Sequence, residues 1–365
     1  MIEENSRSDE IFLPFSKENL EGELGKDFLD VLKMVAPGTS LRVALDDFLN
    51  AKMGALIVLD NGNLGDIVEG GFRVNTKFSS QKLVELAKMD GAIILSKDAK
   101  EIINVNTLLF PSIAIPTKET GTRHKAGERT AKQAKTVAIV VSERKNKISV
   151  YYGDASYRLE RSSEVLRRAS ETLQILEKQR DIYDELLSNL NSLELRRHST
   201  INDVCGVLQR IEIIKRISEV VERYLIELGK EGIIVKMRLK ELMSGLSKEE
   251  ESILKDYFGQ NHSSSLEILE KMDFDFLLEP MNISRLLFEE THDKNVSPNG
   301  LRLLGKTNLL ERYVDLLVGN FENLSEILSA SNEELMEVLG SEAMLSFFRE
   351  EIYNLKEKVN LGKGL

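Results

Sequence analysis

Basic side chains crowd one stretch of an otherwise acidic chain. Residues 121–135 read GTRHKAGERTAKQAK and hold five Lys and Arg residues against one acid, a net charge of +4. Thr122, Arg123 and His124 stand where a loop passes into a helix. Free backbone N–H groups, a hydroxyl, a guanidinium and an imidazole would converge there, which suits a polyphosphate. Composition alone favours the plainer alternative, a solvated basic helix face with a threonine cap.

A carboxylate beside a glycine forms the second pattern, in KMDGAIIL at residues 88–95. Asp90 and Gly91 end a helix and enter an apolar strand. A carboxylate at a sheet edge could hold a divalent metal or accept a hydroxyl proton, and the glycine would let a ligand approach closely. The alternative is a plain helix stop with Gly91 in a left-handed conformation.

The third pattern, GLRLLGKTN at residues 300–308, fits the phosphate-binding motif G-x-x-x-x-G-K-[ST]. That motif needs a buried strand before it and a helix after it. The residues before Gly300 are polar and include Pro298, and the middle of the motif reads as a helix turn with one apolar face. We therefore expect a helical segment that begins near Asn299, not a nucleotide site.

Strands and helices alternate over the first 155 residues, which predicts an α/β domain with a mixed central sheet. The helical segments carry serine or threonine caps, at Thr39 or Ser40 and at Ser79 or Ser80. The six expected strands are 54–60, 72–78, 92–96, 101–110, 137–142 and 148–153.

The rest of the chain reads as helical. Residues 159–197 lack Gly and Pro and form one long amphipathic pattern, and a second runs over 199–243. Both suit a spine or an oligomer contact, with Cys205 packed as a small hydrophobe. The polar run 258–265 predicts a loop, and short helices follow Pro298. We expect three domains: residues 1–155, an all-α spine at 156–297, and a small all-α domain at 298–365.

Composition narrows the class of protein. The 365 residues carry a formal net charge of −11, which disfavours nonspecific binding to nucleic acid or membranes. A single cysteine suits a reducing cytosol. No apolar run is long enough to cross a membrane, and the acidic N-terminus is unlike a signal peptide. The four scattered histidines predict no structural zinc site. These features indicate a cytoplasmic protein.

Taken in order, the motifs resemble a known family. GALIVL, GGF, DGAIIL, LLFPSIAIPTKETGTRH, GERTA and VVSERKNKISVYY are similar to the diadenylate cyclase domain over residues 40–153. The pair DGA and TRH at this separation is the specific part. The helical middle and small helical end extend the resemblance to the DisA (DNA integrity scanning protein) family, whose last domain contains helix-hairpin-helix units.

The resemblance implies an activity. Members of this family condense two ATP molecules into cyclic di-AMP and two pyrophosphates, with Mg²⁺ or Mn²⁺. Each domain holds one ATP, and two domains meet face to face. A two-fold dimer suits a two-fold product because each 3′-hydroxyl can reach the other α-phosphate. The relatives imply a homo-octamer.

The resemblance also implies roles for particular residues. Asp90 would contact the ribose 3′-hydroxyl or the metal, and it is expected to act in catalysis with Arg123 and His124. Gly91 and Leu109 would line the nucleoside pocket. The phosphates would be held by Thr122, Arg123 and His124, helped by Lys125 and Ala126. Ser142 and Glu143, at a strand end, would face the triphosphate or the metal.

Two departures from the family pattern set further expectations. The usual R-H-R-T-A-E is R-H-K-A-G-E here, so Lys125 lacks the bidentate fork of arginine, Ala126 lacks a hydroxyl, and turnover should be slower. The terminal hairpin reads LGSEAM and has lost its second glycine, so we expect weak DNA binding. Two other classes stay open: a DNA-junction-binding scaffold with an inactive nucleotide-binding domain, and a nucleotide-sensing interaction protein.

Overall fold

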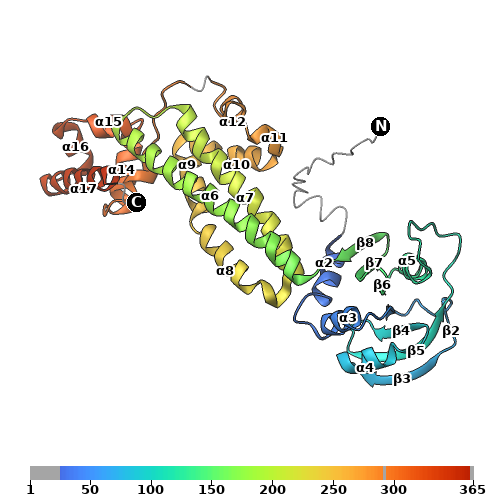
Figure 1. Ribbon diagram of the computed structural model, residues 1–365. Helices are drawn as coiled ribbons and strands as arrows, with labels where there is room; N and C mark the ends of the chain where they lie inside the picture. The colour runs from blue at the N-terminus through green and yellow to red at the C-terminus, as the bar shows by residue number, and fades with distance from the viewer. Residues whose placement is uncertain (1–24, 291–292, 362–365) are drawn as a thin grey trace, which may run out of the picture. The chain divides into compact units, whose positions relative to one another are not determined.

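A computed structural model describes residues 25–290 and 293–361 of the chain (Figure 1). The N-terminal stretch and His292 lie outside the described residues. The chain divides into two compact units, each described by itself: Met1–Glu171 with Glu219–Met237, and Thr172–Ser218 with Arg238–Leu365. The three-part division at residues 155 and 297 stays a prediction.

An eight-stranded mixed sheet forms the centre of the first unit. Its order is β2-β5-β4-β1-β6-β7-β8, with β3 also paired to β5. Strand β1 runs parallel to β4 and antiparallel to β6, so an α/β domain with a mixed sheet is confirmed. The strands are β1 (Ala55–Asp60), β2 (Val68–Glu69), β3 (Phe72–Lys77), β4 (Ala92–Ser96), β5 (Glu101–Leu109), β6 (Val137–Ser142), β7 (Lys147–Tyr152) and β8 (Ala155–Leu159).

Helices cover both faces of this sheet, because alternate residues of the buried strands point in opposite directions. Ile57, Ile93 and Ile139 belong to the core that includes residues of α2 (Gly25–Met34), α3 (Ser40–Asn50) and α4 (Ser80–Leu86). Their neighbours Val58 and Val140 belong to a second core with residues of α5 (Thr122–Ala134). The sheet therefore separates α5 from α2, α3 and α4.

All six expected strands and both capped helices are confirmed. Thr39 and Ser79 are the caps, and each accepts a backbone N–H three residues ahead. The short strand β2 and the edge strand β8 were not expected. Strand β2 has only two residues, and β8 has no fully buried residue, so neither leaves a strong hydrophobic pattern.

Helices make up the rest of the described chain. The long amphipathic segment forms α6 (Ser162–Arg196) as expected, and Cys205 is buried in α7 (Ile201–Leu228). The second helical stretch expected over 199–243 is confirmed, but it is not one continuous helix. Gly229 has a φ of +52° and ends α7, and a 3₁₀ turn, η1 (Gly229–Gly232), leads into α8 (Ile233–Leu242).

The loop expected at 258–265 is also wrong in part. Its first residue, Phe258, ends a helix, the next three form a 3₁₀ turn, η2 (Gly259–Asn261), and its last four begin α10 (His262–Lys271). The remaining helices are α9 (Leu246–Phe258), α11 (Phe274–Leu277), α12 (Pro280–Leu287), α13 (Leu301–Leu304), α14 (Glu311–Asn320), α15 (Leu324–Ser329), α16 (Asn332–Leu339) and α17 (Glu342–Asn360). Together they confirm the all-α character of the middle and end of the chain.

The terminal helices share one hydrophobic core and end in a hairpin of α16 and α17. Leu303, Leu317 and Phe348 are fully buried in this core. Gly340, with a φ of +76°, closes α16, and Ser341 caps α17 by accepting the N–H of Met344. The side chain of Ser341 in the hairpin turn therefore satisfies one of the free backbone N–H groups at the start of α17.

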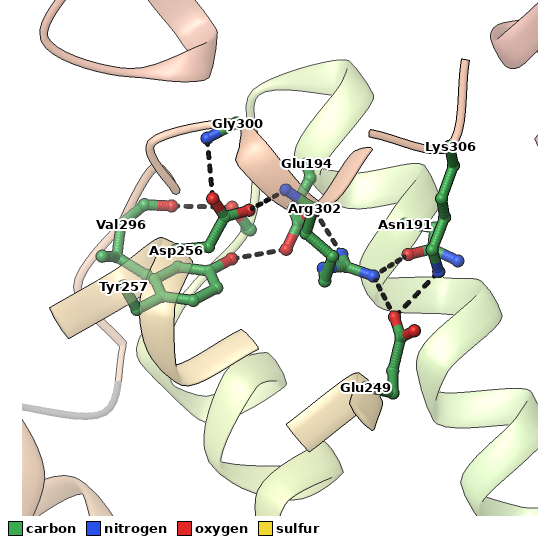
Figure 2. Close-up of polar contacts among 10 residues, drawn as sticks. Asn191, Glu194, Glu249, Asp256, Tyr257, Val296, Gly300, Arg302 and Lys306 are labelled. Atoms are coloured by element: carbon green, nitrogen blue, oxygen red, sulfur yellow. Dashed lines mark hydrogen bonds and ion pairs between the residues drawn. The ribbon is translucent and has the colours of Figure 1, made fainter. Parts of the chain in front are cut away.

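The apparent phosphate-binding motif at 300–308 holds a carboxylate of the protein itself. Asp256 on α9 accepts the N–H of Gly300 over 3.0 Å and the N–H of Arg302 over 3.2 Å, as Figure 2 shows. Lys306 donates to Glu249 over 2.8 Å. The segment between them is the four-residue helix α13. The expectation of a helical segment is confirmed, although its N-cap is Gly300 instead of Asn299.

Candidate nucleotide site at one edge of the sheet

One edge of the sheet gathers the residues that the sequence singled out. Strands β1 and β4 are parallel, with Ile57 opposite Ile93. Continuing this register by three residues places Gly54 opposite Asp90. Strand β5 is antiparallel to β4, with Ala92 opposite Thr107, so the same continuation places Leu109 beside Asp90.

Strand β6 brings the other end of the sequence to the same edge. It is antiparallel to β1, with Ala55 opposite Val141. Its last residue, Ser142, and the exposed Glu143 therefore follow directly at this edge. Segments far apart in the chain, near residues 54, 90, 109 and 142, thus meet because of the strand order.

Gly91 is required by the backbone that lies next to it. Its φ is +89°, and a Cβ at this position would lie 2.8 Å from the carbonyl oxygen of Thr107. The cause is a bulge in β5: Asn106 has a φ of +52°, and three steps of β5 from Asn104 to Thr107 oppose two of β4. Gly91 is left-handed, as the alternative of a plain helix stop predicted, but α4 ends at Leu86, before the exposed Asp90.

Helix α5 presents an open N-terminus. Its N-cap is Gly121, and no side chain caps its first turn. The threonine cap considered above is therefore wrong, because Thr122 is the first helical residue. At Gly127, a Cβ would lie 2.7 Å from the side chain of Val140, so glycine lets α5 pack closely on β6. The uncapped first turn keeps N–H groups available to an anion.

Arg123 reaches across the sheet edge from this helix. Its Nη1 lies 2.2 Å from the position that a Cβ on Gly54 would occupy. The guanidinium therefore rests against the backbone that leads into β1, beside the strand that begins after Asp90. Gly54 carries no signal of this role in the sequence, since it is separated from Arg123 by 69 residues.

His124 is held by a chain of two hydrogen bonds. Its Nδ1 lies 2.9 Å from the hydroxyl of Tyr151 on β7, and that hydroxyl donates to Oε1 of Glu119 over 3.0 Å. Burial lowers the pKa of His124 below its usual value, while the Glu119 carboxylate acts in the opposite direction. Tyr151 and Glu119 were not expected from the sequence, which gives no sign that they meet His124.

Several charges of the basic stretch hold a loop instead of a ligand. Arg129 donates to the carbonyl of Ile115 over 2.9 Å, and Lys132 pairs with Glu128 over 2.8 Å. Glu128 also accepts the hydroxyl of Thr117. Burial raises the pKa of Glu128, but the bonds from Lys132 and Thr117 outweigh it and lower the pKa. The loop before α5 is thereby fixed to the helix that carries His124.

The remaining candidates lie around the same helix start. Lys125 is exposed in the first turn, and Ala126 packs partly against the core beneath α5. Leu109 packs against that core from the end of β5. The Oγ atom of Ser142 accepts the N–H of Lys145 over 3.3 Å. Every candidate residue therefore lies either at the sheet edge or in the first turn of α5, and none is remote.

The carboxylates at this edge fit a metal that arrives with a nucleotide. Asp90 has no hydrogen bond or ion pair within residues 25–290 and 293–361, so both of its oxygens can accept a ligand. Across that same part of the chain, no group of three or more His, Cys, Asp or Glu residues could hold a metal alone. Mg²⁺ commonly binds one or two carboxylates and completes its shell with phosphate oxygens and water. Asp90, with Glu143 nearby in the strand order, meets that requirement.

None of the described helices is both long and apolar enough to span a membrane.

Two family models match successive parts of the chain. Residues 42–156 match the family described as DisA bacterial checkpoint controller nucleotide-binding, and residues 159–295 match the DisA bacterial checkpoint controller linker region.

Two curated relatives are called DNA integrity scanning protein DisA. The protein from Clostridioides difficile is 40% identical over 93% of this chain and 98% of its own length. The protein from Acetivibrio thermocellus is 42% identical over 88% of this chain and 92% of its own length. The chain therefore belongs to the DisA family, and it is a diadenylate cyclase, a nucleotidyltransferase that uses ATP.

Proposed function

We propose that two molecules of this protein condense two ATP into cyclic di-AMP and two pyrophosphates in the cytoplasm, across a face-to-face dimer of the sheet domain. The observation that carries this proposal is the convergence of Asp90, Arg123 and the uncapped start of α5 at one sheet edge. The carboxylate would activate the attacking 3′-hydroxyl, and the positive groups would bind the triphosphate. Phosphoryl-transfer enzymes act mainly through such positioning and charge neutralisation.

Each residue then has a defined task. Asp90 accepts the proton of the ribose 3′-hydroxyl or holds Mg²⁺ or Mn²⁺. The N–H groups of Thr122 and its neighbours bind phosphate oxygens, and Arg123 neutralises charge on the α-phosphate side. Gly91 and Leu109 contact the nucleoside, while Lys125, Ala126, Ser142 and Glu143 surround the triphosphate and metal. His124 binds the triphosphate from its half-buried position at the start of α5.

The dimer is supported by apolar side chains that are exposed next to the site. Leu108, Phe110 and Ile113 are 54%, 58% and 84% exposed, and they lie at the end of β5 and just beyond it, around Leu109. A cluster of this kind fits a surface that a second copy would cover. A single site cannot close the product ring. Each of the two new bonds joins the 3′-hydroxyl of one ATP to the α-phosphate of a second ATP in the opposite orientation.

We extend the proposal to assembly and DNA. Helices α6 and α7 would join dimers into an octamer. The relatives' name refers to DNA, and we propose that DNA contact by the terminal hairpin regulates the cyclase only weakly. Ser341 accepts a backbone N–H at the start of α17, and the acidic Glu342 follows it. The turn therefore has one N–H group fewer for a DNA phosphate and a negative charge that repels it.

One assay tests the activity directly. Purified protein is incubated with ATP and Mn²⁺, and the products are separated by chromatography with cyclic di-AMP as the standard. We expect cyclic di-AMP and two pyrophosphates for each ring. Omission of the metal is expected to stop the reaction. Release of AMP or ADP without any cyclic product would reject the proposal.

A further inference from the structure

Glu119, Tyr151 and His124, from three separate segments, form a chain of hydrogen bonds. Glu119 lies in the loop before α5, Tyr151 lies on β7, and His124 lies in the first turn of α5. Resting on the proposed function, we infer that Tyr151 and Glu119 are positioning residues that fix the tautomer and the ring of His124 for the triphosphate. They are separated from His124 by 27 and 5 residues in sequence, so only the fold brings them together.

The direction of the hydrogen bonds follows from what each group can donate. An ionised carboxylate only accepts, so the hydroxyl of Tyr151 donates a hydrogen bond to Glu119. The phenolic oxygen is then left to accept from Nδ1–H of His124. Neutral His124 must therefore carry its proton on Nδ1 and leave the lone pair on Nε2. The charge of Glu119 further stabilises the ring when Nε2 gains a proton.

The other ring nitrogen of His124, Nε2, lies near the start of α5. Nε2 is buried and has no hydrogen-bond partner in the described part of the chain. The adjacent ring carbon, Cδ2, lies 3.4 Å from where a Cβ on Gly121 would stand, next to the uncapped start of α5. A buried polar atom without a partner is costly, so it points to a missing ligand group. A phosphate oxygen that accepts from protonated Nε2 would satisfy it.

The surroundings of His124 support a single defined role. Tyr151 contacts its Nδ1, and Glu119 in turn accepts from the hydroxyl of Tyr151. Lys145, from the turn after β6, and Arg158, from β8, are the cations that face it and disfavour its charge. On α5 itself the neighbouring charges are Arg123 and Lys125, and Glu128 is already paired with Lys132. Since positive groups outnumber Glu119, a bound triphosphate is what would favour protonation of Nε2.

The tautomer can be measured without any assay of activity. Protein labelled with ¹⁵N-histidine is sedimented and studied by magic-angle-spinning NMR, with the His124 signals assigned from a His124→Gln variant. At neutral pH we expect a protonated Nδ1 and a bare Nε2. In Tyr151→Phe, which lacks the accepting oxygen, the signals should move to a protonated Nε2. A wild-type His124 that already carries its proton on Nε2 would overturn the inference.

Kinetics provide the second arm, with a matched control. Tyr157 also donates to a carboxylate, that of Glu227, but this pair has no histidine. We expect Tyr151→Phe to lower kcat about tenfold to a hundredfold, as when a group that orients a ligating histidine is lost. In Tyr151→Phe, KM for ATP should change less than kcat. The kcat of the control Tyr157→Phe should stay near that of the wild type. Glu119→Gln, which keeps an accepting oxygen, should retain more activity than Glu119→Ala.

The two arms separate the two claims. Equal kcat in Tyr151→Phe and Tyr157→Phe, in a wild type that makes cyclic di-AMP, would overturn the positioning role. A wild type that makes no cyclic di-AMP would reject the proposed function, and the NMR arm would still decide whether Tyr151 sets the tautomer.

Discussion

Asp90 is the exposed carboxylate at the edge of the sheet, and its charge is what the proposed mechanism uses. Asp90→Asn keeps the shape of the side chain but removes the base and the metal ligand. We expect a loss of turnover on the order of a hundredfold or more, because an acid–base or metal group is lost. ATP should still bind, since Arg123 and the start of α5 remain. Turnover by product chromatography and ATP binding by calorimetry measure the two effects, and near-wild-type turnover would remove Asp90 from the mechanism.

Arg123 and Lys306 offer a matched pair of cations. Arg123 lies at the sheet edge against Gly54, whereas Lys306 lies in the false phosphate-binding motif and donates to Glu249. We expect Arg123→Ala to weaken ATP binding and turnover together, by about tenfold or more, through loss of a charge-assisted phosphate contact. Lys306→Ala should leave ATP affinity unchanged in the same titration. The opposite result would move the nucleotide site to residues 300–308.

For single residues, the sequence predicts the candidate ligand-binding groups well. It predicts poorly which other residues hold those groups in place. Asp90, Arg123 and His124 stand out because polar and charged residues at strand ends and helix starts are typical of sites. Gly54 and Tyr151 do not stand out. Their part in the site comes from the order of β1, β6 and β7 in the sheet, which hydrophobic patterns do not encode.

Helices α6, α9 and α13 are joined by Arg302, whose side chain is only 1% exposed. It donates to Asn191 over 2.6 Å and to Glu249 over 2.9 Å, and it pairs with the buried Glu194 (Figure 2). Arg302→Ala would leave Glu194 as an unpaired buried charge. We therefore expect the free energy of unfolding to fall by about 3–5 kcal/mol, the range for removing one partner of a buried pair.

The control for this prediction is the exposed Arg312 of α14. Arg312→Ala should change the free energy of unfolding by less than about 1 kcal/mol, as is usual for surface positions. Denaturant unfolding of both variants, followed by circular dichroism, gives the comparison. Equal loss in the two variants would show that the buried network adds nothing specific.

Among the elements, those with strong local signals were predicted and those that depend on distant neighbours were not. Thr39 and Ser79 mark helix starts by local hydrogen bonds, so both were found. The break at Gly229 was missed because apolar residues continue across it. A Cβ on this glycine would lie 2.6 Å from the carbonyl of Pro37, a contact that sequence periodicity cannot reveal.

For the whole molecule, the shared site makes activity depend on assembly. If two sheet domains must meet, turnover per subunit should fall when dilution separates them. We expect light scattering to show an assembly larger than a dimer, and a fragment ending near Gly153 to form smaller, concentration-dependent species. Activity is measured over a dilution series with ATP held constant. Undiminished activity from a full-length monomer at nanomolar concentration would contradict the face-to-face mechanism.

The charge of the C-terminal region leads to the last prediction, which is weak DNA binding. Residues 300–365 carry seven Lys and Arg against eleven acids, a net charge of −4. The structure engages several of the seven: Arg302 and Lys306 pair with carboxylates, and Arg349 donates to the carbonyl of Ala330. DNA affinity depends largely on free cations that neutralise phosphates. Only a few exposed cations remain in the described part of this region, among them Lys356 and Lys358.

Titration of labelled four-way junction and duplex DNA at about 50 and 200 mM salt measures this, since phosphate-driven binding weakens steeply over that range. We expect weak binding at the lower salt and almost none at the higher. Replacing Lys356 and Lys358 together by Glu should reduce what remains, because they are the exposed cations of α17. Lys248→Glu on α9 serves as a control for charge reversal outside residues 300–365. Multiple subunits could raise affinity through avidity, but they would multiply the acidic surface as well. Tight junction binding at the higher salt that is lost only in the Lys356 and Lys358 variant would show that local geometry outweighs the net charge.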